Sequence, residues 1–150
     1  MAATITVFLK RLPGGQDLPL PVRMTEESAG VDLRAAVTQT MTLPPGDVLV
    51  VPCGFAMAIP KGYEAQVRPR SGLASKHGIT LVNSPGTIDS DYRGEVMVPL
   101  INLGKLPFVI ERGMRIAQML VLPVPPVSFV EVDALEATGR GTGGFGHTGH

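Results

Sequence analysis

The sequence lacks several features that would assign its class at once. Its 150 residues include one cysteine, Cys53, and no tryptophan. A single cysteine cannot form a disulfide within the chain or supply a cysteine-based zinc site, and it fits a reducing compartment. No apolar run approaches the roughly 20 residues of a membrane span. The start, Met1 to Thr6, lacks the basic and apolar regions of a signal peptide. We therefore expect a soluble, cytoplasmic protein with no membrane partner.

Net charge is also lacking. Thirteen Lys and Arg residues balance thirteen Asp and Glu residues. Such a chain has no global basic field, so we expect no nucleic-acid partner, and any anionic ligand requires locally placed positive charge. With 44% apolar and 17% charged residues, the composition indicates one globular domain rather than a disordered chain.

Glycine and proline are abundant, with 18 and 14 residues. They separate short apolar runs, which is typical of an all-β sandwich, jelly roll or barrel. One short helix is expected over 71–76, with Ser71 as its N-cap and Gly78 as its stop. Strands are expected over 4–10, 31–37, 41–43, 48–51, 55–59, 63–68, 79–83, 95–102, 108–110, 116–122 and 127–132.

The C-terminal part differs from the rest. The segment 122–126 reads Leu-Pro-Val-Pro-Pro, which is stiff and extended because proline fixes φ and cannot donate to a sheet. We therefore expect a β core over 1–122, followed over 123–150 by a proline hinge, one strand and a glycine-rich tail. A strand beyond a rigid hinge is a candidate for exchange onto a neighbouring subunit.

Three segments carry candidate chemistry. Pro69-Arg70-Ser71-Gly72 opens the short helix, where backbone N–H groups and a guanidinium suit phosphate. On these residues alone, a capped turn with a surface arginine is the better explanation. The segment 83–95 reads as a hairpin with a wide polar tip, and it offers an amide (Asn83), a flat ring (Tyr92) and carboxylates (Asp89, Asp91). A solvated acidic hairpin is the alternative.

The tail is the third segment. Arg140 precedes a loop dense in glycine, where successive N–H groups can wrap phosphate while Phe145 stacks on a base. Composition alone favours a disordered end, although a phenylalanine among glycines makes a closing lid a reasonable alternative.

Taken in order, five segments resemble the five motifs of the trimeric dUTPase family. Any one of them is weak evidence, whereas five in order over most of the chain are specific. The segments are Ala29-Gly30-Val31-Asp32-Leu33-Arg34-Ala35, Pro69-Arg70-Ser71-Gly72-Leu73-Ala74, Gly86-Thr87-Ile88-Asp89-Ser90-Asp91-Tyr92-Arg93-Gly94-Glu95, Arg115-Ile116-Ala117-Gln118-Met119 and Arg140-Gly141-Thr142-Gly143-Gly144-Phe145-Gly146.

The resemblance implies a distorted jelly roll that hydrolyses dUTP to dUMP and pyrophosphate, keeping uracil out of DNA and supplying dUMP for dTMP synthesis. Water would attack the α-phosphorus with Asp89 as general base, and Gln118 would orient the water or hold the phosphate chain. Tyr92 would pack under the deoxyribose and reject a 2′-hydroxyl. The uracil edge would pair with Asn83 and with the backbone of Met97.

The resemblance also implies a Mg²⁺ cofactor held chiefly by the triphosphate, with Asp32 contacting it through water. It implies a homotrimer in which the arm of another subunit closes each site. The implied phosphate-binding residues are Arg70, Ser71 and Gly72, and those of the closing arm are Arg140, Gly143, Phe145, Gly146 and Thr148.

Two positions depart from the family pattern. Thr87 stands where an aliphatic residue is usual, and His147 where serine is most familiar. The nearest alternative is a dCTP deaminase, which shares the fold, but the complete fifth motif and Asp-Ser-Asp-Tyr at 89–92 argue against it. A non-catalytic jelly-roll binding module is the second alternative, and the presence of both Asp89 and Gln118 argues against that.

Overall fold

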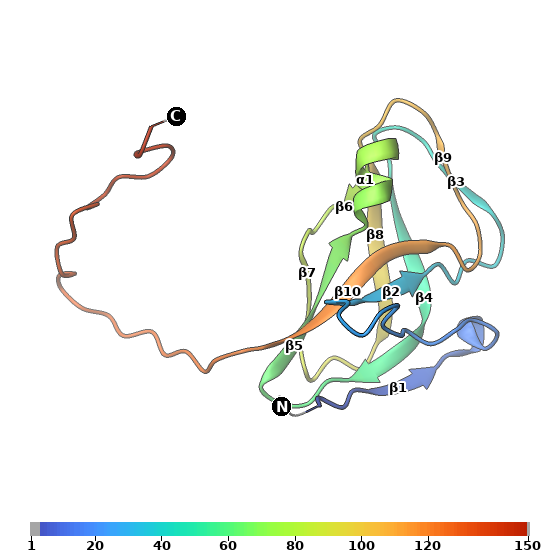
Figure 1. Ribbon diagram of the computed structural model, residues 1–150, viewed down its shortest axis with the longest axis horizontal. Coiled ribbons are helices and arrows are strands. Elements are labelled where there is room, and N and C mark those ends of the chain that lie inside the picture. The colour runs from blue at the N-terminus through green and yellow to red at the C-terminus, as the bar shows by residue number, and fades with distance from the viewer. Residues whose placement is uncertain (1–3, 150) are drawn as a thin grey trace.

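The computed structural model describes residues 4–149, so the first three residues of the segment inspected for a signal peptide lie outside it. Two four-stranded antiparallel sheets pack face to face, and a two-stranded ribbon joins them at one end (Figure 1). One sheet has the order β1-β4-β8-β6 and the other β2-β10-β5-β7, while β3 pairs with β9. The elements are β1 (Phe8–Arg11), η1 (Pro13–Gly15), β2 (Val31–Arg34), β3 (Met41–Leu43), β4 (Val48–Ala58), β5 (Tyr63–Pro69), α1 (Ser71–His77), β6 (Ile79–Leu81), β7 (Gly86–Ile88), β8 (Glu95–Asn102), β9 (Phe108–Ile110) and β10 (Arg115–Pro123).

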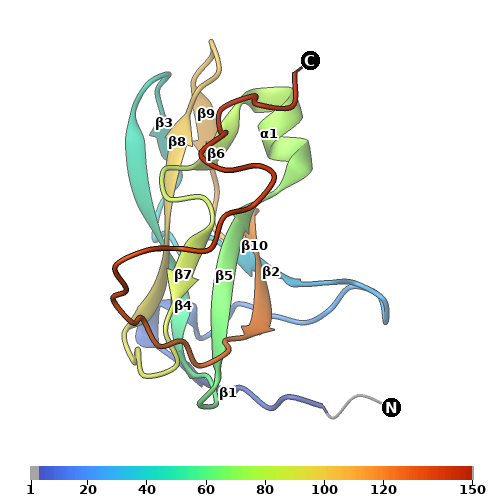
Figure 2. The ribbon, with the colours of Figure 1, turned by 90° about the vertical axis from the view of Figure 1, so that its left-hand side faces the viewer.

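Alternating side chains build the core between the two sheets. Along β8 the buried residues are Val96, Val98 and Leu100, while β5 contributes Ala65 and Val67 from the opposite sheet. Side chains on a strand point alternately to the two faces, so each sheet presents one apolar face inward. The expected all-β distorted jelly roll with one short helix is confirmed. Both ribbon views place α1 at the end of the sandwich near the β3–β9 ribbon and β1 at the other end (Figures 1 and 2).

The sequence missed one strand, and this strand matters for the site. The segment between β6 and β8 was expected to be a plain hairpin tip, but it contains β7, which pairs with β5 in the other sheet. The chain therefore leaves the first sheet, adds a strand to the second, and returns as β8. This crossing fixes the residues after β7 at the edge of the sandwich.

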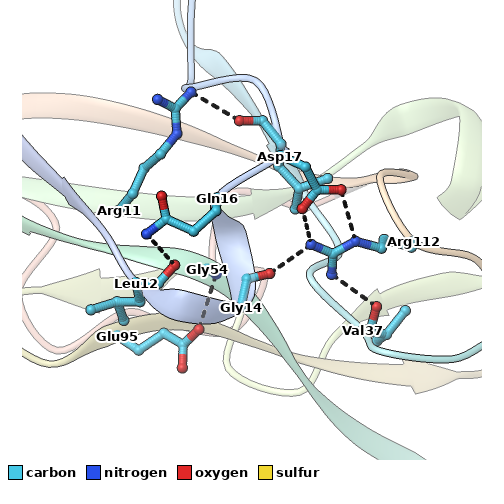
Figure 3. Close-up of polar contacts among 10 residues, drawn as sticks. Arg11, Leu12, Gly14, Gln16, Asp17, Val37, Gly54, Glu95 and Arg112 are labelled. Atoms are coloured by element: carbon cyan, nitrogen blue, oxygen red, sulfur yellow. Dashed lines mark hydrogen bonds and ion pairs between the residues drawn. The ribbon is translucent and has the colours of Figure 1, made fainter.

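The two expected strands over 48–51 and 55–59 are one strand, β4, interrupted by a bulge. Pro52 on β4 pairs with Met97 on β8, and the next pair is Ala56 with Glu95. More residues therefore separate the two pairs on β4 than on β8. The extra residues leave backbone groups without ladder partners, which a bulge must satisfy elsewhere. The carbonyl of Gly54 accepts from the N–H of Leu12 at 2.9 Å, and its N–H donates to the Glu95 carboxylate at 3.0 Å (Figure 3).

Asn102, at the end of β8, is the one fully enclosed polar side chain among residues 4–149. Its amide donates to the carbonyls of Leu43 and Leu106 at 2.9 and 2.8 Å, and its oxygen accepts the N–H of Gly104 at 2.9 Å. The side chain therefore ties β3 and the β8–β9 loop together, and all of its hydrogen-bonding groups except one lone pair are used.

The N-terminal segment is fastened to the body by Arg112. Its guanidinium donates to the Gly14 carbonyl at 2.7 Å and to the Val37 carbonyl at 3.1 Å, and it pairs with the Asp17 carboxylate (Figure 3). The hydrogen bond from the Arg112 guanidinium to the Asp17 carboxylate lowers the pKa of Asp17.

After β10 the chain leaves the sandwich. The last backbone contact with the body is the N–H of Val124, which donates to Gly62 at 2.8 Å, and the rest runs as an extended arm (Figures 1 and 2). Residues 127–132 form no strand within the single chain. The expectation was a strand exchanged onto a neighbouring subunit, so it stays a prediction. None of the helices in residues 4–149 is long and apolar enough to cross a membrane.

Candidate functional site

A cluster of one carboxylate and two guanidinium groups lies where β2, β10 and the start of α1 meet. Arg70 Nε and Arg115 Nη1 each lie 3.3 Å from one oxygen of Asp32. The carboxylate is largely covered, with 18% of the side chain exposed, whereas 29% and 41% of the two arginine side chains are exposed. Two cations against one anion leave a net positive charge that solvent can reach, which suits an anionic ligand.

Backbone pairing explains why these residues meet. Asp32 on β2 lies opposite Gln118 on β10, and Gln118 lies opposite Arg68 on β5. Arg70 follows β5 directly and donates to the Arg115 carbonyl at 3.2 Å, while Gln118 donates to the Pro69 carbonyl at 3.2 Å. Sequence segments more than 30 residues apart thus form one polar row across the sheet.

The helix start differs from the expectation in one respect. Arg70 rather than Ser71 precedes the first turn, in extended conformation, and no side chain caps the helix. Ser71 and Gly72 are exposed, so their backbone N–H groups face solvent beside the two guanidinium groups. The expected stop at Gly78 is confirmed, because this residue has a left-handed φ of 68° and donates to the carbonyls of the last turn.

A second group of candidate residues surrounds a cavity of about 250 Å³ between β7 and β8. Asp89, Tyr92 and Met97 line it together, and the remaining lining residues are Thr87, Ile88, Glu95 and Val96. The N–H of Tyr92 donates to the Asp89 carbonyl at 3.2 Å, which closes a turn carrying both side chains. Because Asp89 is exposed in this turn, its carboxylate is accessible to water.

Asn83 lies near this cavity but is not among its lining residues. Its amide nitrogen is 3.3 Å from the position that a side-chain carbon on Gly86 would take, at the start of β7. The side chain is exposed.

A larger cavity of about 940 Å³ lies next to the same turn, and Asp89, Asp91 and Arg93 line it together with the beginning of the arm at Val124.

The candidate residues of the arm are close to one another but stand apart from the sandwich in Figure 1. Arg140 donates from Nε to the Gly143 carbonyl at 2.7 Å, and the Gly143 N–H donates back to Arg140 at 3.1 Å. Phe145 is fully exposed and has a positive φ of 48°. Gly146 and Thr148 are also exposed. The single chain therefore places the arm residues outside both candidate groups.

Sequence reasoning missed three residues of these groups. Arg115 stands in the fourth motif and could have been paired with Asp32 had β2 and β10 been recognised as neighbours. Glu95 was interpreted only as the end of the third motif, although it lines the smaller cavity. Arg93 donates to the carbonyls of Ser90 and Tyr92 at 2.6 and 2.9 Å, a role that its sequence position does not reveal.

The described residues contain no group of three or more His, Cys, Asp or Glu side chains able to hold a metal ion. One carboxylate already paired with two arginines is a poor direct ligand for Mg²⁺. It fits a contact through metal-bound water, because Mg²⁺ often keeps several waters when substrate phosphates bind it.

Comparison with known proteins gives a consistent result. The sequence profile of the dUTPase family matches residues 16–149. The deoxyuridine 5'-triphosphate nucleotidohydrolase of Rhizobium etli (strain CIAT 652) is 59% identical over 146 residues, which cover 96% of this chain and 94% of that protein. The dUTPase of Staphylococcus bacteriophage 80alpha, solved with dUPNHPP, is 27% identical with a TM-score of 0.84, covering 98% and 100% of the two chains. The dUTPase of phage phi11 of S. aureus, described with a structural Mg(II) ion, shares the fold at 23% identity and a TM-score of 0.77, covering 88% and 99%.

Proposed function

The chain belongs to the dUTPase family, and from this premise we propose that it hydrolyses dUTP to dUMP and pyrophosphate by attack of water on the α-phosphorus. The observation that carries the proposal is that Asp89, Tyr92 and Met97 line one small cavity. A carboxylate, a flat ring and a strand backbone at one cavity are what the reaction requires of a nucleoside site. The activity keeps uracil out of DNA and supplies dUMP for dTMP synthesis.

Asp89 acts as the general base. A carboxylate can take a proton from water only when it is ionised and within hydrogen-bond reach of that water. Its exposure at the cavity supports this role, and no cation holds it in an ion pair among the described residues. Gln118 orients the water or the phosphate chain from the polar row beside Asp32, because its amide oxygen remains available while its nitrogen donates to Pro69.

Recognition of the nucleoside uses the same hairpin. The ring of Tyr92 packs against the deoxyribose and leaves no room for a 2′-hydroxyl. The uracil edge pairs with the β8 backbone at Met97 and with the Asn83 amide, which offers a donor and an acceptor. Unpaired polar groups and steric overlap reject a wrong nucleoside more strongly than the loss of one apolar contact.

The triphosphate binds at the Asp32 cluster. The guanidinium of Arg70 and the N–H groups of Ser71 and Gly72 face solvent there, and each can donate to phosphate oxygens. Asp32 would hold Mg²⁺ through a metal-bound water, and the ion would supply charge shielding at the phosphate oxygens. When an arginine moves from the Asp32 carboxylate to a phosphate, its guanidinium exchanges one anionic partner for another. The guanidinium therefore loses little electrostatic stabilisation.

Two features support a homotrimer with shared sites. The arm over 123–150 leaves the core over 1–122, and it carries Arg140, Gly143, Phe145, Gly146 and Thr148 away from its own chain. The strand over 127–132 and the lid therefore complete a neighbouring subunit. The proline hinge holds the arm extended and limits the entropy that docking costs.

The outer face of the β4–β8–β6 sheet is the second feature. Val48, Val50, Val82 and Met97 are 52%, 52%, 55% and 43% exposed, and strand pairing places Val48 opposite Ile101 and Val50 opposite Pro99. An antiparallel sheet in a monomer usually presents polar residues on its solvated face. A contiguous apolar face on the outside supports burial against further copies of this chain.

The assignment of the base is tested by Asp89→Asn, with Asp91→Asn as a matched control two residues away. We expect pyrophosphate release from dUTP to fall about 10³-fold in Asp89→Asn, because general-base catalysis contributes on that order, while calorimetry still detects dUMP binding. Asp91→Asn makes the same change of charge and should retain activity. Equal turnover by Asp89→Asn and the parent would exclude Asp89 as the base.

The shared site is tested by mixing two inactive variants. Asp89→Asn lacks the base, and a chain ending at Val132 lacks the lid. If sites are shared, unfolding and refolding the two together yields mixed oligomers in which some sites have both an intact base and an intact lid. We expect activity to return only in the mixture. No recovery, with light scattering showing mixed trimers, would exclude an arm supplied by another subunit.

A further inference from the structure

Tyr92 is held at several points, which its assigned role does not explain. Its N–H donates to the Asp89 carbonyl at 3.2 Å, and its hydroxyl donates to the Glu95 carbonyl at 2.9 Å. The Arg93 guanidinium donates to the carbonyls on both sides of the turn, at Ser90 and Tyr92. The side chain is nevertheless 47% exposed. An exposed tyrosine on a loop normally keeps rotational freedom, so these contacts hold the ring in one place.

Gly94 supplies the surface on which the ring rests. A side-chain carbon added at Gly94 would lie 2.6 Å from Cζ and 3.0 Å from Cε2 of Tyr92. Carbon atoms that are not bonded approach to about 3.5 Å, so any side chain at this position must displace the ring. Gly94 does not line the cavity. Residue 94 must therefore leave space for the hydroxyl end of the Tyr92 ring rather than for a ligand in the cavity.

Glu95 anchors the ring at the same, hydroxyl end. Its carbonyl accepts the Tyr92 hydroxyl, and its carboxylate accepts the Gly54 N–H, which the β4 bulge has left without a ladder partner (Figure 3). The residue that accepts the Tyr92 hydroxyl is thus held in two ways. Its backbone pairs with Ala56 on β4, and its carboxylate accepts the hydrogen bond from Gly54 in the bulge. The carboxylate is partly buried, which strengthens a hydrogen bond to a charged acceptor.

We propose that Gly94 and Glu95 are positioning residues for Tyr92, and that together they set how strongly the enzyme discriminates deoxyribose from ribose. The proposal rests on the proposed function, in which Tyr92 packs against the sugar. A ring that rests against Gly94 and is held at its hydroxyl by Glu95 cannot retreat to admit a 2′-hydroxyl. Freed from either, it can yield to the ribonucleotide and makes a poorer contact with dUTP.

The first test compares Gly94→Ala with Gly14→Ala, a glycine whose added side-chain carbon meets no atom within 4 Å. We expect Gly94→Ala to raise the KM for dUTP about tenfold or more, because small misplacements of a contact at the site have effects of this size. The change in kcat should stay within about threefold, since the Asp89 turn keeps its backbone bonds. Unchanged kinetics in Gly94→Ala, with Gly14→Ala also unchanged, would overturn the proposal.

The second test separates the hydrogen bond of Glu95 from its charge and does not depend on Gly94→Ala folding. Glu95→Gln keeps an acceptor oxygen for the Gly54 N–H, whereas Glu95→Ala removes it. We expect the ratio of kcat/KM for dUTP to that for UTP to fall about fivefold in Glu95→Ala, the equivalent of one hydrogen bond. Glu95→Gln should preserve this ratio. Equal ratios in all three proteins, or equal losses in the two variants, would contradict the assigned role.

The parent protein distinguishes failure of this proposal from failure of the proposed function. Pyrophosphate release from dUTP by the parent establishes the reaction on which the variants are compared. If the parent released no pyrophosphate from dUTP, the proposed function would be wrong, whatever the variants showed. Calorimetry with dUMP and UMP would then show whether Gly94 and Glu95 still govern the preference between the two sugars.

Discussion

Replacing Asn102 gives the sharpest prediction about how the fold is held together. Asn102→Leu keeps the approximate volume and removes all three side-chain hydrogen bonds, at 2.9, 2.8 and 2.9 Å. The carbonyls of Leu43 and Leu106 and the N–H of Gly104 then lose their partner, in a buried position at Leu43 and in partly buried positions at the other two. At about 1 kcal/mol for each hydrogen bond, the free energy of unfolding should fall by about 3 kcal/mol.

Urea denaturation followed by far-UV circular dichroism measures this change, with all proteins at one subunit concentration because an oligomer's stability depends on it. Thr42→Ala, an exposed substitution on β3, is the control and should shift the free energy by less than about 0.5 kcal/mol. Turnover per folded molecule should be unchanged in Asn102→Leu, since Asn102 lies in neither candidate group. A loss below about 1 kcal/mol would mean that these groups find other partners, and Asn102 would then not hold β3 and the β8–β9 loop together.

Asn102→Asp extends the same test through pH. A buried carboxylate facing two carbonyl oxygens has its pKa raised, so the folded state binds its proton more tightly than the unfolded chain. The destabilisation is therefore present at neutral pH and declines as pH falls through the raised folded-state value. We expect Asn102→Asp to be less stable than Asn102→Leu at pH 7 and the gap to narrow on acidification. A gap independent of pH would contradict the burial of this position.

Three further predictions follow from named contacts. Burial, with the nearby charge of Glu95, raises the pKa of the Cys53 thiol to about 12, so the native thiol should resist alkylation at pH 8. Relative to Cys53→Ala, stability should also fall by about 1.4 kcal/mol per pH unit above about pH 9, where the unfolded thiol loses its proton first. The lowered pKa of Asp17 means that Asp17→Asn loses stability at neutral pH and none once the pH is below the folded-state value, as denaturation at low salt will measure. Asp32→Asn should raise the Mg²⁺ concentration for half-maximal activity about tenfold, in line with other outer-sphere groups, which a metal titration of EDTA-treated enzyme checks.

The sequence predicted best those strands whose residues alternate. The spacing along β8 and the short runs of β3 and β9 match the structure residue for residue, since side chains pointing into a common core leave a period of two. The expected strand over 127–132 has a similar run of apolar residues but no partner within its own chain. Alternation indicates that a segment can pair, and only the presence of an adjacent edge makes it a strand.

The candidate site was predictable only as separate pieces. The ordered motifs identified Asp32, Arg70, Asp89, Tyr92 and Gln118, but nothing in the sequence showed that β7 crosses to the second sheet. Contacts that depend on tertiary pairing were therefore missed, namely Arg115 on Asp32 and Glu95 on the β4 bulge. Ser71 was expected to cap the helix on residue type alone, whereas Arg70, extended and engaged with Asp32, occupies that position.

We propose that the cavity of Asp89, Tyr92 and Met97 and the arginine cluster at Asp32 together serve one reaction, the hydrolysis of dUTP. The most direct measurement is release of pyrophosphate and ammonia from dUTP, dTTP, dCTP and UTP, each with Mg²⁺ and with EDTA. We expect rapid pyrophosphate release from dUTP with Mg²⁺, much slower release with EDTA, and little product from the other three nucleotides. Ammonia from dCTP, or comparable hydrolysis of dUTP and UTP, would contradict it.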